Sequence, residues 1–310
     1  MQVEEELARL SPKKDMLLTI GVFDGVHLGH KYLLSQLTEH ARQQDLLSGV
    51  VTFRQHPREV LSPSTKLSYL TNLAQKVNLL RNEGVDTVIT LSFTLELAYL
   101  STRQFVGLLM KYLRMCGLII GPDFALGRDK KGNADTLRIL GQKMNYDVTV
   151  IPPARVNSEV VSSTIIRDAL AEGDMKRVIN LIGRAFSLQG QVTTGAGQGS
   201  KLGFPTANLE IDPEQAIPAD GIYATWAYID GQAYQSVTNI GRRPTFGDNE
   251  RTVETYILNY CGNLYGRKLR IDVVERLRAE ERFDTLEELK KQIADDAERG
   301  RAVLNSHGRS

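Results

Sequence analysis

Short apolar runs alternate with amphipathic stretches through residues 16–151. The runs are of strand length, and the stretches between them repeat apolar residues every three or four positions, as a helix with one buried side does. This alternation favours a parallel α/β sheet, in which each helix carries the chain back to the start of the next strand. The predicted strands are Met16–Ile20, Gly49–Phe53, Val85–Leu91, Leu118–Ile120 and Val148–Ile151, and the predicted helices are those that carry Leu33 and Leu37, that begin at Thr71, Ser101 and Ala134, and that follow Asp174.

The pattern changes near Gly183. Beyond it, residues 185–275 hold only short β-rich runs that are broken by glycine, proline and the hairpin pair Asp230-Gly231. Antiparallel strands at this spacing favour a small closed barrel. Apolar residues then return at helical spacing from Thr285 to Leu304, which predicts a C-terminal helix. The predicted strands are Phe186–Val192, Ile222–Ile229, Ala233–Ile240, Thr252–Tyr260 and Leu269–Val274.

Length agrees with this division, because 310 residues are long for one core and sufficient for two. We therefore predict an α/β domain over residues 1–183 and an antiparallel β-barrel domain with a C-terminal helix over residues 184–310. Residues 1–15 are expected to form a leader or a short strand without chemistry of their own.

Composition adds few constraints, since 42% hydrophobic and 24% charged residues are ordinary for a globular protein. A formal net charge of +1 gives no electrostatic reason to expect a nucleic-acid or membrane partner. No apolar run approaches the ~20 residues of a membrane span, and the acidic N-terminus is not a secretory signal. Cys116 and Cys261, the two cysteines, suit a reducing compartment. We expect a cytoplasmic protein without nucleic-acid or membrane partners, either as a monomer or as a homo-oligomer.

The stretch Gly-Val-Phe-Asp-Gly-Val-His-Leu-Gly-His, residues 21–30, joins the first strand to the first helix. His27 and His30 are three residues apart, so both rings lie on one side of the first helical turn. The free N–H groups of that turn attract anions, and two histidine donors suit charge that develops on a phosphate. Gly29 lets a ligand approach the backbone. Two alternatives remain, a metal site that lacks the usual further ligands and surface histidines without a role.

Two further segments of the first half follow predicted strands. His56 lies at the end of the second strand, where parallel sheets bind ligands, although it also fits a loop histidine held by Pro57. The loop 121–133 holds three glycines and a run of four charged residues after the fourth strand, which fits a ligand loop or a solvated loop.

Hydroxyl residues precede the next predicted helix, at Ser162, Ser163 and Thr164. They fit simple N-capping, or a second helix start aimed at phosphates with Arg167 as a charge clamp.

Two features of the second half suggest chemistry. The glycine-rich segment 195–203 can close over phosphates with its backbone N–H groups, although it is not a P-loop and a flexible hairpin is the alternative. Glu254 lies in a run that is otherwise apolar or neutral, so its carboxylate is either paired in the barrel or held for chemistry.

These segments together resemble a known family. The Gly-x-Phe-Asp-Gly prefix with His-x-Gly-His is similar to the HxGH nucleotidylyltransferases, and the form Phe-Asp-Gly-Val-His resembles the bacterial FAD synthetases, which are bifunctional riboflavin kinase/FMN adenylyltransferases. Thr-Phe-x-x-His-Pro and Ser-Ser-Thr-x-Ile-Arg extend the likeness. In the second half Gly-Phe-Pro-Thr-Ala-Asn resembles the riboflavin kinase motif, and matches continue at residues 239–246, 253–258, 264–266 and 277–278.

The resemblance implies a Rossmann-like nucleotidylyltransferase domain followed by a riboflavin kinase-like barrel. The barrel would phosphorylate riboflavin to FMN with Mg-ATP, and the first domain would transfer adenylate from ATP to FMN, giving FAD and pyrophosphate. It implies that Glu254 is the general base and that Thr206 and Asn208 serve Mg²⁺, with His27 and His30 as the catalytic pair of the first domain. Phosphate or ATP contacts are implied for Gly21, Phe23, Asp24, Gly29, Ser162, Ser163, Thr164, Arg167, Gly195, Gly197, Gly199 and Lys201, and flavin contacts for His56, Asp123 and Arg278.

The sequence departs from the family pattern mainly in the barrel. Thr194, Gln198 and Ser200 replace the histidine and arginine that are common near the glycine-rich segment, Tyr256 replaces a histidine, and Leu126 replaces a phenylalanine in the first domain. A barrel that binds flavin for regulation, with weak or no kinase activity, is therefore an alternative. A different HxGH nucleotidylyltransferase with an unrelated barrel is another, against which the Gly-Phe-Pro-Thr-Ala-Asn segment argues.

Overall fold

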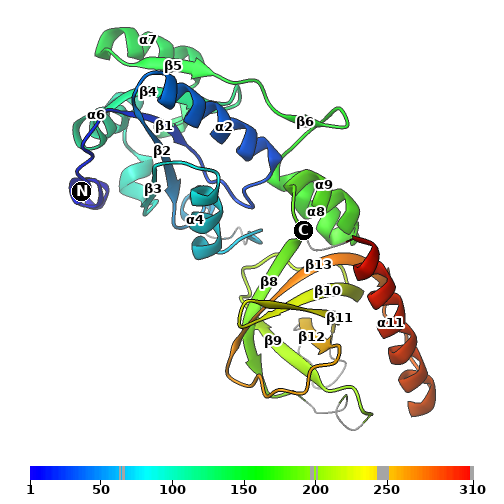
Figure 1. The fold of residues 1–310 in the computed structure, drawn as a ribbon. Coiled ribbons are helices and arrows are strands. Elements are labelled where there is room, and N and C mark those ends of the chain that lie inside the picture. Colours follow the sequence, from blue (N-terminus) through cyan, green and yellow to red (C-terminus); the bar gives the residue numbers. More distant parts are fainter. Residues whose placement is uncertain (63, 65–66, 196–198, 200–201, 243–250, 308–310) are drawn as a thin grey trace. The chain divides into compact units, whose positions relative to one another are not determined.

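A computed structural model describes residues 1–62, 64, 67–195, 199, 202–242 and 251–307 of the chain. The chain forms two compact units, residues 1–163 and residues 164–310, and each is described by itself (Figure 1). Within the described residues, no helix combines the length and the apolar character that crossing a membrane would require.

The first unit is built on a five-stranded parallel sheet with the strand order β3-β2-β1-β4-β5. This confirms the predicted α/β sheet. The strands are β1 (Met16–Ile20), β2 (Leu47–Phe53), β3 (Thr87–Leu91), β4 (Met115–Ile120) and β5 (Asp147–Val150), joined by a short hairpin of β6 (Arg155–Val156) and β7 (Glu159–Val160) to the chain that follows. The helices are α1 (Gln2–Ala8), α2 (Leu28–Gln43), α3 (Pro57–Leu61), α4 (Leu73–Asn82), α5 (Leu95–Ala98), α6 (Thr102–Leu113), the 3₁₀ turn η1 (Arg128–Lys130) and α7 (Ala134–Met144).

Helices cover both faces of this sheet, which explains why every residue of the central strand β1 is buried. Leu18 packs into a cluster with residues of α6 and α7, whereas its neighbour Leu17 packs into a second cluster with α2 and α4. Successive strand residues point to opposite faces, so a continuous apolar run is what a strand buried on both sides requires. The loops that follow β1, β2 and β4 all leave the carboxyl edge of the sheet.

The N-terminal segment differs from its prediction as a leader or short strand, because residues 2–8 form the helix α1. Val3 and Leu7, one helical turn apart, are 1% and 0% exposed and belong to the cluster around α6. Glu6 accepts hydrogen bonds from the backbone N–H and the hydroxyl of Ser92, at 2.9 and 2.7 Å. Two apolar positions were too few to reveal a helical period.

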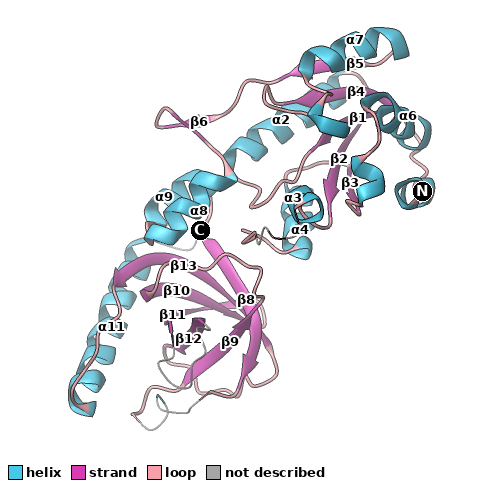
Figure 2. Cartoon of the chain, turned by 180° about the vertical axis from the view of Figure 1, so that it is seen from behind, coloured by secondary structure: helices cyan, strands magenta, loops and turns pink. Residues whose placement is uncertain are grey.

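The second unit contains a closed barrel with the strand order β10-β11-β12-β9-β8-β13, whose neighbours are all antiparallel (Figure 2). The barrel and its C-terminal helix are confirmed, whereas β9 was not predicted. The elements are α8 (Ser163–Glu172), α9 (Met175–Ile182), β8 (Phe186–Thr193), β9 (Thr206–Ile211), β10 (Gly221–Ile229), β11 (Gln232–Arg242), β12 (Arg251–Ile257), β13 (Lys268–Arg278) and α11 (Leu286–His307).

Side chains alternate between the inside and the outside of the barrel. Trp226, Val237 and Val274 form a cluster with Leu304 of α11, so they face outward beneath that helix. Their neighbours face inward and include a fully buried set of hydroxyl groups that bond to one another, namely Thr225, Ser236, Thr238 and Thr255. Each buried hydroxyl thereby has a partner, as a polar group in a barrel interior needs.

Helix α9 packs against β8 and β13 and therefore belongs with the barrel. Its buried residues are Met175, Val178, Leu181 and Ile182, and it ends at Gly183, which adopts a left-handed conformation with φ 76°. The predicted boundary at residue 183 thus lies at the end of a helix, while the division between compact units lies at residues 163 and 164. Where the two domains can be separated stays a prediction.

We expect residues 164–310 to fold alone and to be more stable than residues 184–310. Loss of α9 exposes the surface that four large apolar side chains cover, and burying each is worth roughly 1.5–3 kcal/mol, so a difference of about 3 kcal/mol or more is expected. Urea unfolding of the two fragments, followed by circular dichroism, measures it. Equal stabilities would mean that α9 contributes nothing to the barrel, and an unfolded 164–310 fragment would contradict the division.

Candidate functional site

The two histidines lie where the chain passes from β1 into α2. His27 is the N-cap of α2, and its Nδ1 accepts a hydrogen bond from the backbone N–H of His30 at 3.3 Å. An accepting Nδ1 places the proton of the neutral ring on Nε2. The two rings stack, with centroids 3.6 Å apart and an angle of 17° between their planes. The predicted placement of both rings on one side of the first helical turn is therefore what the structure has.

His30 is a half-buried residue whose ring packs against its neighbours. The ring of Phe23 meets it edge-on at 5.0 Å between centroids. Burial, followed by the nearby charges of His27 and Lys76, holds the pKa of His30 well below its usual value, so the ring is neutral at pH 7. Its Nδ1 is buried and has no hydrogen-bond partner within the described part of the chain. A buried polar atom without a partner calls for one, and a ligand can supply it.

The segment before α8 lies close to residues 21–30, the turn between β1 and α2 that carries both histidines and is called the histidine turn below. Ser163 donates a hydrogen bond from its hydroxyl to the backbone oxygen of Asp24, at 2.9 Å. A Cβ on Gly29 would lie 3.1 Å from the His27 ring and 3.2 Å from the backbone oxygen of Val161, so only glycine allows this approach without a shift. Gly21 is tight in the same way, because its Cβ would lie 2.9 Å from the ring of Phe23.

These contacts place Ser163 against the backbone of the turn that carries the histidines, and Ser162 is the residue before it. Thr164 and Arg167 follow in α8 and belong to the second compact unit.

Asp24 has a structural role that the sequence did not reveal. Its side chain is buried, and its carboxylate accepts hydrogen bonds from the backbone N–H groups of Leu70 and Thr71 at 3.0 and 3.2 Å. Asp24 thus fastens the histidine turn to the segment that leads into α4. A direct contact with ATP stays a prediction for this residue.

The two candidate flavin residues of the first unit lie in loops that follow strands. The Nδ1 atom of His56 accepts from the backbone N–H of Arg58 at 3.0 Å, and the His56 backbone N–H donates to the Tyr69 hydroxyl at 2.8 Å. His56 is therefore the N-cap of α3. Asp123 is exposed in the loop after β4. Flavin contacts by either residue stay predictions.

In the barrel, strand register brings the kinase candidates together. Glu254 of β12 pairs with Asn208 of β9 on one side and with Asn239 of β11 on the other. Thr255 points into the barrel, so its neighbour Glu254 and the residues directly opposite it stand on the outer face. Side chains in such cross-strand positions have Cβ atoms about 4.5–5.5 Å apart. Thr206, two residues before Asn208, lies on the same face.

Two described glycines of the glycine-rich segment, Gly195 and Gly199, lie close to these residues. A Cβ on Gly195 would overlap the side-chain amide of Asn208, and a Cβ on Gly199 would lie 3.3 Å from the hydroxyl of Thr206. Both glycines therefore permit close contact with the two candidate Mg²⁺ residues. Four residues named from the sequence, Gly197, Gln198, Ser200 and Lys201, lie outside the described residues.

A cavity of about 210 Å³ opens next to Thr206, between β9 and the segment after β12. Tyr260, Asn263 and Tyr265 are among its lining residues. The cavity therefore reaches the same end of β9 that carries Thr206. Sequence reasoning missed β9 itself, although Ala207, Leu209 and Ile211 alternate with polar residues as a half-buried strand requires.

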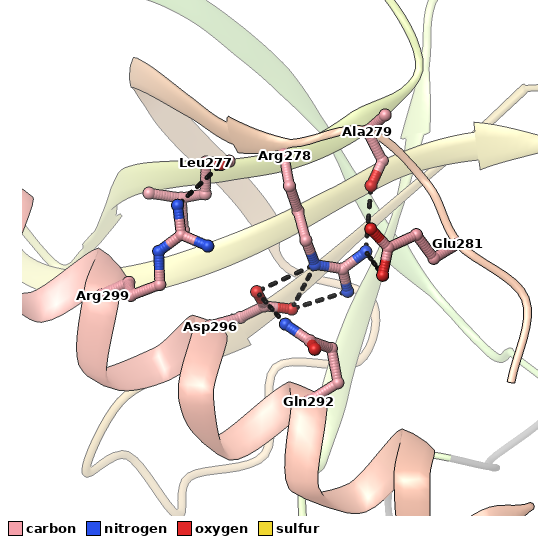
Figure 3. A network of polar contacts seen from close by, with 7 residues as sticks. All are labelled: Leu277, Arg278, Ala279, Glu281, Gln292, Asp296 and Arg299. Carbon is pink, nitrogen blue, oxygen red and sulfur yellow. Dashed lines mark hydrogen bonds and ion pairs between the residues drawn. The ribbon is translucent and has the colours of Figure 1, made fainter.

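Arg278 at the end of β13 bonds to Asp296 of α11 (Figure 3). Its Nε and Nη2 atoms donate to the carboxylate of Asp296 at 3.0 and 2.7 Å, and its Nη1 atom donates to the backbone oxygen of Ala279 at 2.9 Å. The two side chains are only 13% and 4% exposed, so this pair fastens the C-terminal helix to the barrel. A flavin contact by Arg278 stays a prediction.

Metal binding by the two histidines was an alternative at the outset. Among the residues that the structure describes, no group of three or more His, Cys, Asp or Glu side chains could hold a metal ion. The oxygen atoms of Thr206 and Asn208 are the hard ligands that Mg²⁺ takes together with substrate phosphates.

The lowered pKa of His30 predicts a loss of stability in acid. Its pKa is lowered in the folded protein, so below about pH 6.5 the unfolded chain binds a proton that the folded chain does not. By pH 5.5 this costs about 1 kcal/mol relative to neutral pH. Between pH 7 and pH 5.5, the free energy of unfolding of His30→Gln should fall by about 1 kcal/mol less than that of the wild type, as measured by urea unfolding. His40→Gln, in the same helix, is the control. Identical slopes of stability against pH for wild type and His30→Gln would contradict the assignment.

Comparisons with known proteins show the family of the chain. A family model described as FAD synthetase matches residues 10–165, and one described as riboflavin kinase matches residues 182–304. Bifunctional riboflavin kinase/FMN adenylyltransferases from Pseudomonas fluorescens and Escherichia coli strain K12 are 37% and 35% identical, covering 98% and 92% of this chain and the same shares of their own. A crystal structure described as a macrolide-efflux protein from Streptococcus pneumoniae is 28% identical and covers 97% of each chain, with a TM-score of 0.89. The chain therefore belongs to the bifunctional riboflavin kinase/FMN adenylyltransferases, which confirms the resemblance found in the sequence.

Proposed function

We propose that the barrel phosphorylates riboflavin to FMN and that the α/β unit then adenylylates FMN to FAD, with ATP as the donor in both steps. The observation that carries the proposal is that one chain holds two separate sets of suitable groups. The stacked histidines lie at the start of α2, and Glu254 lies opposite Asn208 on the barrel. The family membership of the chain supports the same pair of activities.

Adenylyl transfer needs positioning and charge stabilisation rather than a protein nucleophile. An FMN phosphate oxygen attacks the α-phosphorus of ATP, the bond from that phosphorus to the bridging oxygen breaks, and pyrophosphate leaves. His27, which as a neutral ring carries its proton on Nε2, and His30 can donate hydrogen bonds to phosphate oxygens as charge shifts onto them. The free N–H groups at the start of α2 add to this attraction for anions.

Riboflavin phosphorylation needs a base, because a primary alcohol is a poor nucleophile until its proton leaves. Glu254 takes the proton of the 5′-hydroxyl as the new O–P bond forms, and the γ-phosphoryl group leaves ADP. Thr206 and Asn208 would hold the Mg²⁺ that accompanies ATP, which offsets the charge on the phosphates. The contact of Gly195 and Gly199 with these two side chains supports a phosphate-binding role for the glycine-rich segment.

The surroundings in which this enzyme works are part of the proposal. A net charge of +1 supports a protein without nucleic-acid or membrane partners, and the two cysteines, both free thiols in the structure, suit the cytoplasm. Riboflavin, FMN, FAD and ATP are the proposed ligands, with Mg²⁺ as the metal.

A second candidate function is an FMN adenylyltransferase whose barrel binds flavin for regulation. Thr194, which stands where relatives commonly have a histidine, favours it because this residue adjoins the glycine-rich segment. Incubation with riboflavin and Mg-ATP, followed by chromatography, separates the two candidates. FMN and FAD are expected. FAD formed from supplied FMN but no product from riboflavin would support the regulatory barrel, and no flavin product from either would contradict both.

Glu254→Gln provides the test of the general base. The amide keeps the size and hydrogen-bonding capacity of the carboxylate but cannot take the proton, so FMN formation should fall by about 10²–10⁴-fold. Conversion of supplied FMN to FAD should continue at the wild-type rate. Glu275→Gln, which changes an exposed carboxylate on β13, is the matched control and should leave both activities intact. Near-normal kinase turnover in Glu254→Gln would leave Glu254 as a structural residue.

A further inference from the structure

Lys76 is a buried lysine beneath the histidine turn. It lies on α4, and its side chain belongs to a residue that is only 4% exposed. Its Nζ atom donates to the backbone oxygens of Phe53 and Val22, at 2.8 and 3.1 Å. Lysine is rarely buried, because burial removes the hydration of its ammonium group. A buried lysine therefore needs hydrogen-bond acceptors that replace the lost water.

The two oxygens belong to the ends of neighbouring strands. Val22 follows β1 in the turn that leads to His27, and Phe53 is the last residue of β2. Thr52 also donates from its hydroxyl to the Val22 oxygen, at 3.0 Å. One backbone oxygen of the histidine turn is thus held by two buried side chains, one from β2 and one from α4.

A second set of contacts runs in the opposite direction. Asp24 of the turn accepts the backbone N–H groups that lead into α4, and the Thr71 hydroxyl accepts the Gly25 N–H at 3.2 Å. Asp24 therefore bonds the turn to the segment before α4, and Lys76 of α4 donates a hydrogen bond back to the turn. The charges of Asp24 and Lys76 also attract each other.

The ammonium group acts on the histidines as well as on the backbone. Burial lowers the pKa of Lys76 to about 8, against the opposing attraction of Asp24, so the group is mainly charged at pH 7. That charge and the charge of His27 are two of the causes that keep the pKa of His30 low. Lys76 thereby contacts the backbone of the turn and also affects the protonation of His30.

We propose that Lys76 is a positioning residue for adenylyl transfer, which fixes the histidine turn against the end of β2 without touching the substrates. This inference rests on the proposed function of the same site. The turn carries both histidines, and the backbone oxygen of Val22 within it accepts hydrogen bonds from the side chains of Lys76 and Thr52. Small errors in the placement of catalytic groups cost large factors in rate.

Lys76→Met tests the proposal, because it keeps an unbranched side chain and removes the donors and the charge. The kcat for FAD formation from FMN should fall at least about tenfold, toward the ~10²-fold cost of a small misplacement, with a smaller change in KM. The low-pH limb of the FAD-forming rate should move to higher pH, because the charge of Lys76 that opposes protonation of His30 is gone, while His27 and Asp24 remain. Riboflavin kinase activity of the same chain should not change.

Two controls separate positioning from folding. Arg81→Met removes an exposed cation from the same helix and should leave the rate and its pH profile unchanged. Thr52→Val removes the other hydrogen bond to the Val22 oxygen with little change in shape. It should lower FAD formation about fivefold, the scale of one neutral hydrogen bond, even if Lys76→Met does not fold.

Three results would overturn the proposal. They are a normal rate of FAD formation in Lys76→Met, an equal loss of both activities in proportion to folded protein, and a normal rate in Thr52→Val. Wild-type enzyme that makes no FAD from FMN would instead contradict the proposed function itself.

Discussion

Two bulky residues in the turn between β1 and α2 are held in a conformation that they rarely adopt. Phe23 and Val26 have φ values of 52° and 38°, and a β-branched residue at positive φ costs on the order of 1–3 kcal/mol. Both side chains are buried at 2% and 0% exposure, so the core holds the turn from within. Asp24 fastens the turn to the segment before α4, and Lys76 holds it from α4 itself. These surrounding contacts allow the strain to persist, and this path of the chain stacks the two histidine rings.

In the barrel, the strand register keeps Glu254 on the same face as Thr206 and Asn208, the two candidate Mg²⁺ residues. Side chains alternate along a strand, so a shift of one residue in β12 would bury Glu254 and expose Thr255. The hydroxyl contacts from Thr225 through Thr238 to Thr255 exist only in the observed register. The polar interior therefore fixes the register of the candidate kinase residues on the outer face, including the pairing of Glu254 with Asn208.

Local patterns predicted much of this fold, and contacts between distant segments account for what they missed. The capping box of Ser101 and Gln104 is a local signal, and the structure has both of its hydrogen bonds. The role of Asp24 depends on backbone N–H groups 46 and 47 residues away, which no local pattern contains. Lys76 looked like an ordinary helix residue, because its two partners lie 54 and 23 residues earlier in the chain. The motif residues were found because they resemble those of a known family, and the comparisons confirm that the chain belongs to this family.

Mixing two single variants tests most directly whether the two sites act as separate catalysts on one chain. His30→Ala should retain the barrel site and accumulate FMN from riboflavin and Mg-ATP, whereas Glu254→Gln should leave riboflavin almost unchanged. When the two variants are combined, the FMN that one releases becomes the substrate of the other, so FAD should form in the mixture although neither variant makes it alone. A mixture that forms FMN but no FAD, while Glu254→Gln still converts supplied FMN, would contradict independent sites.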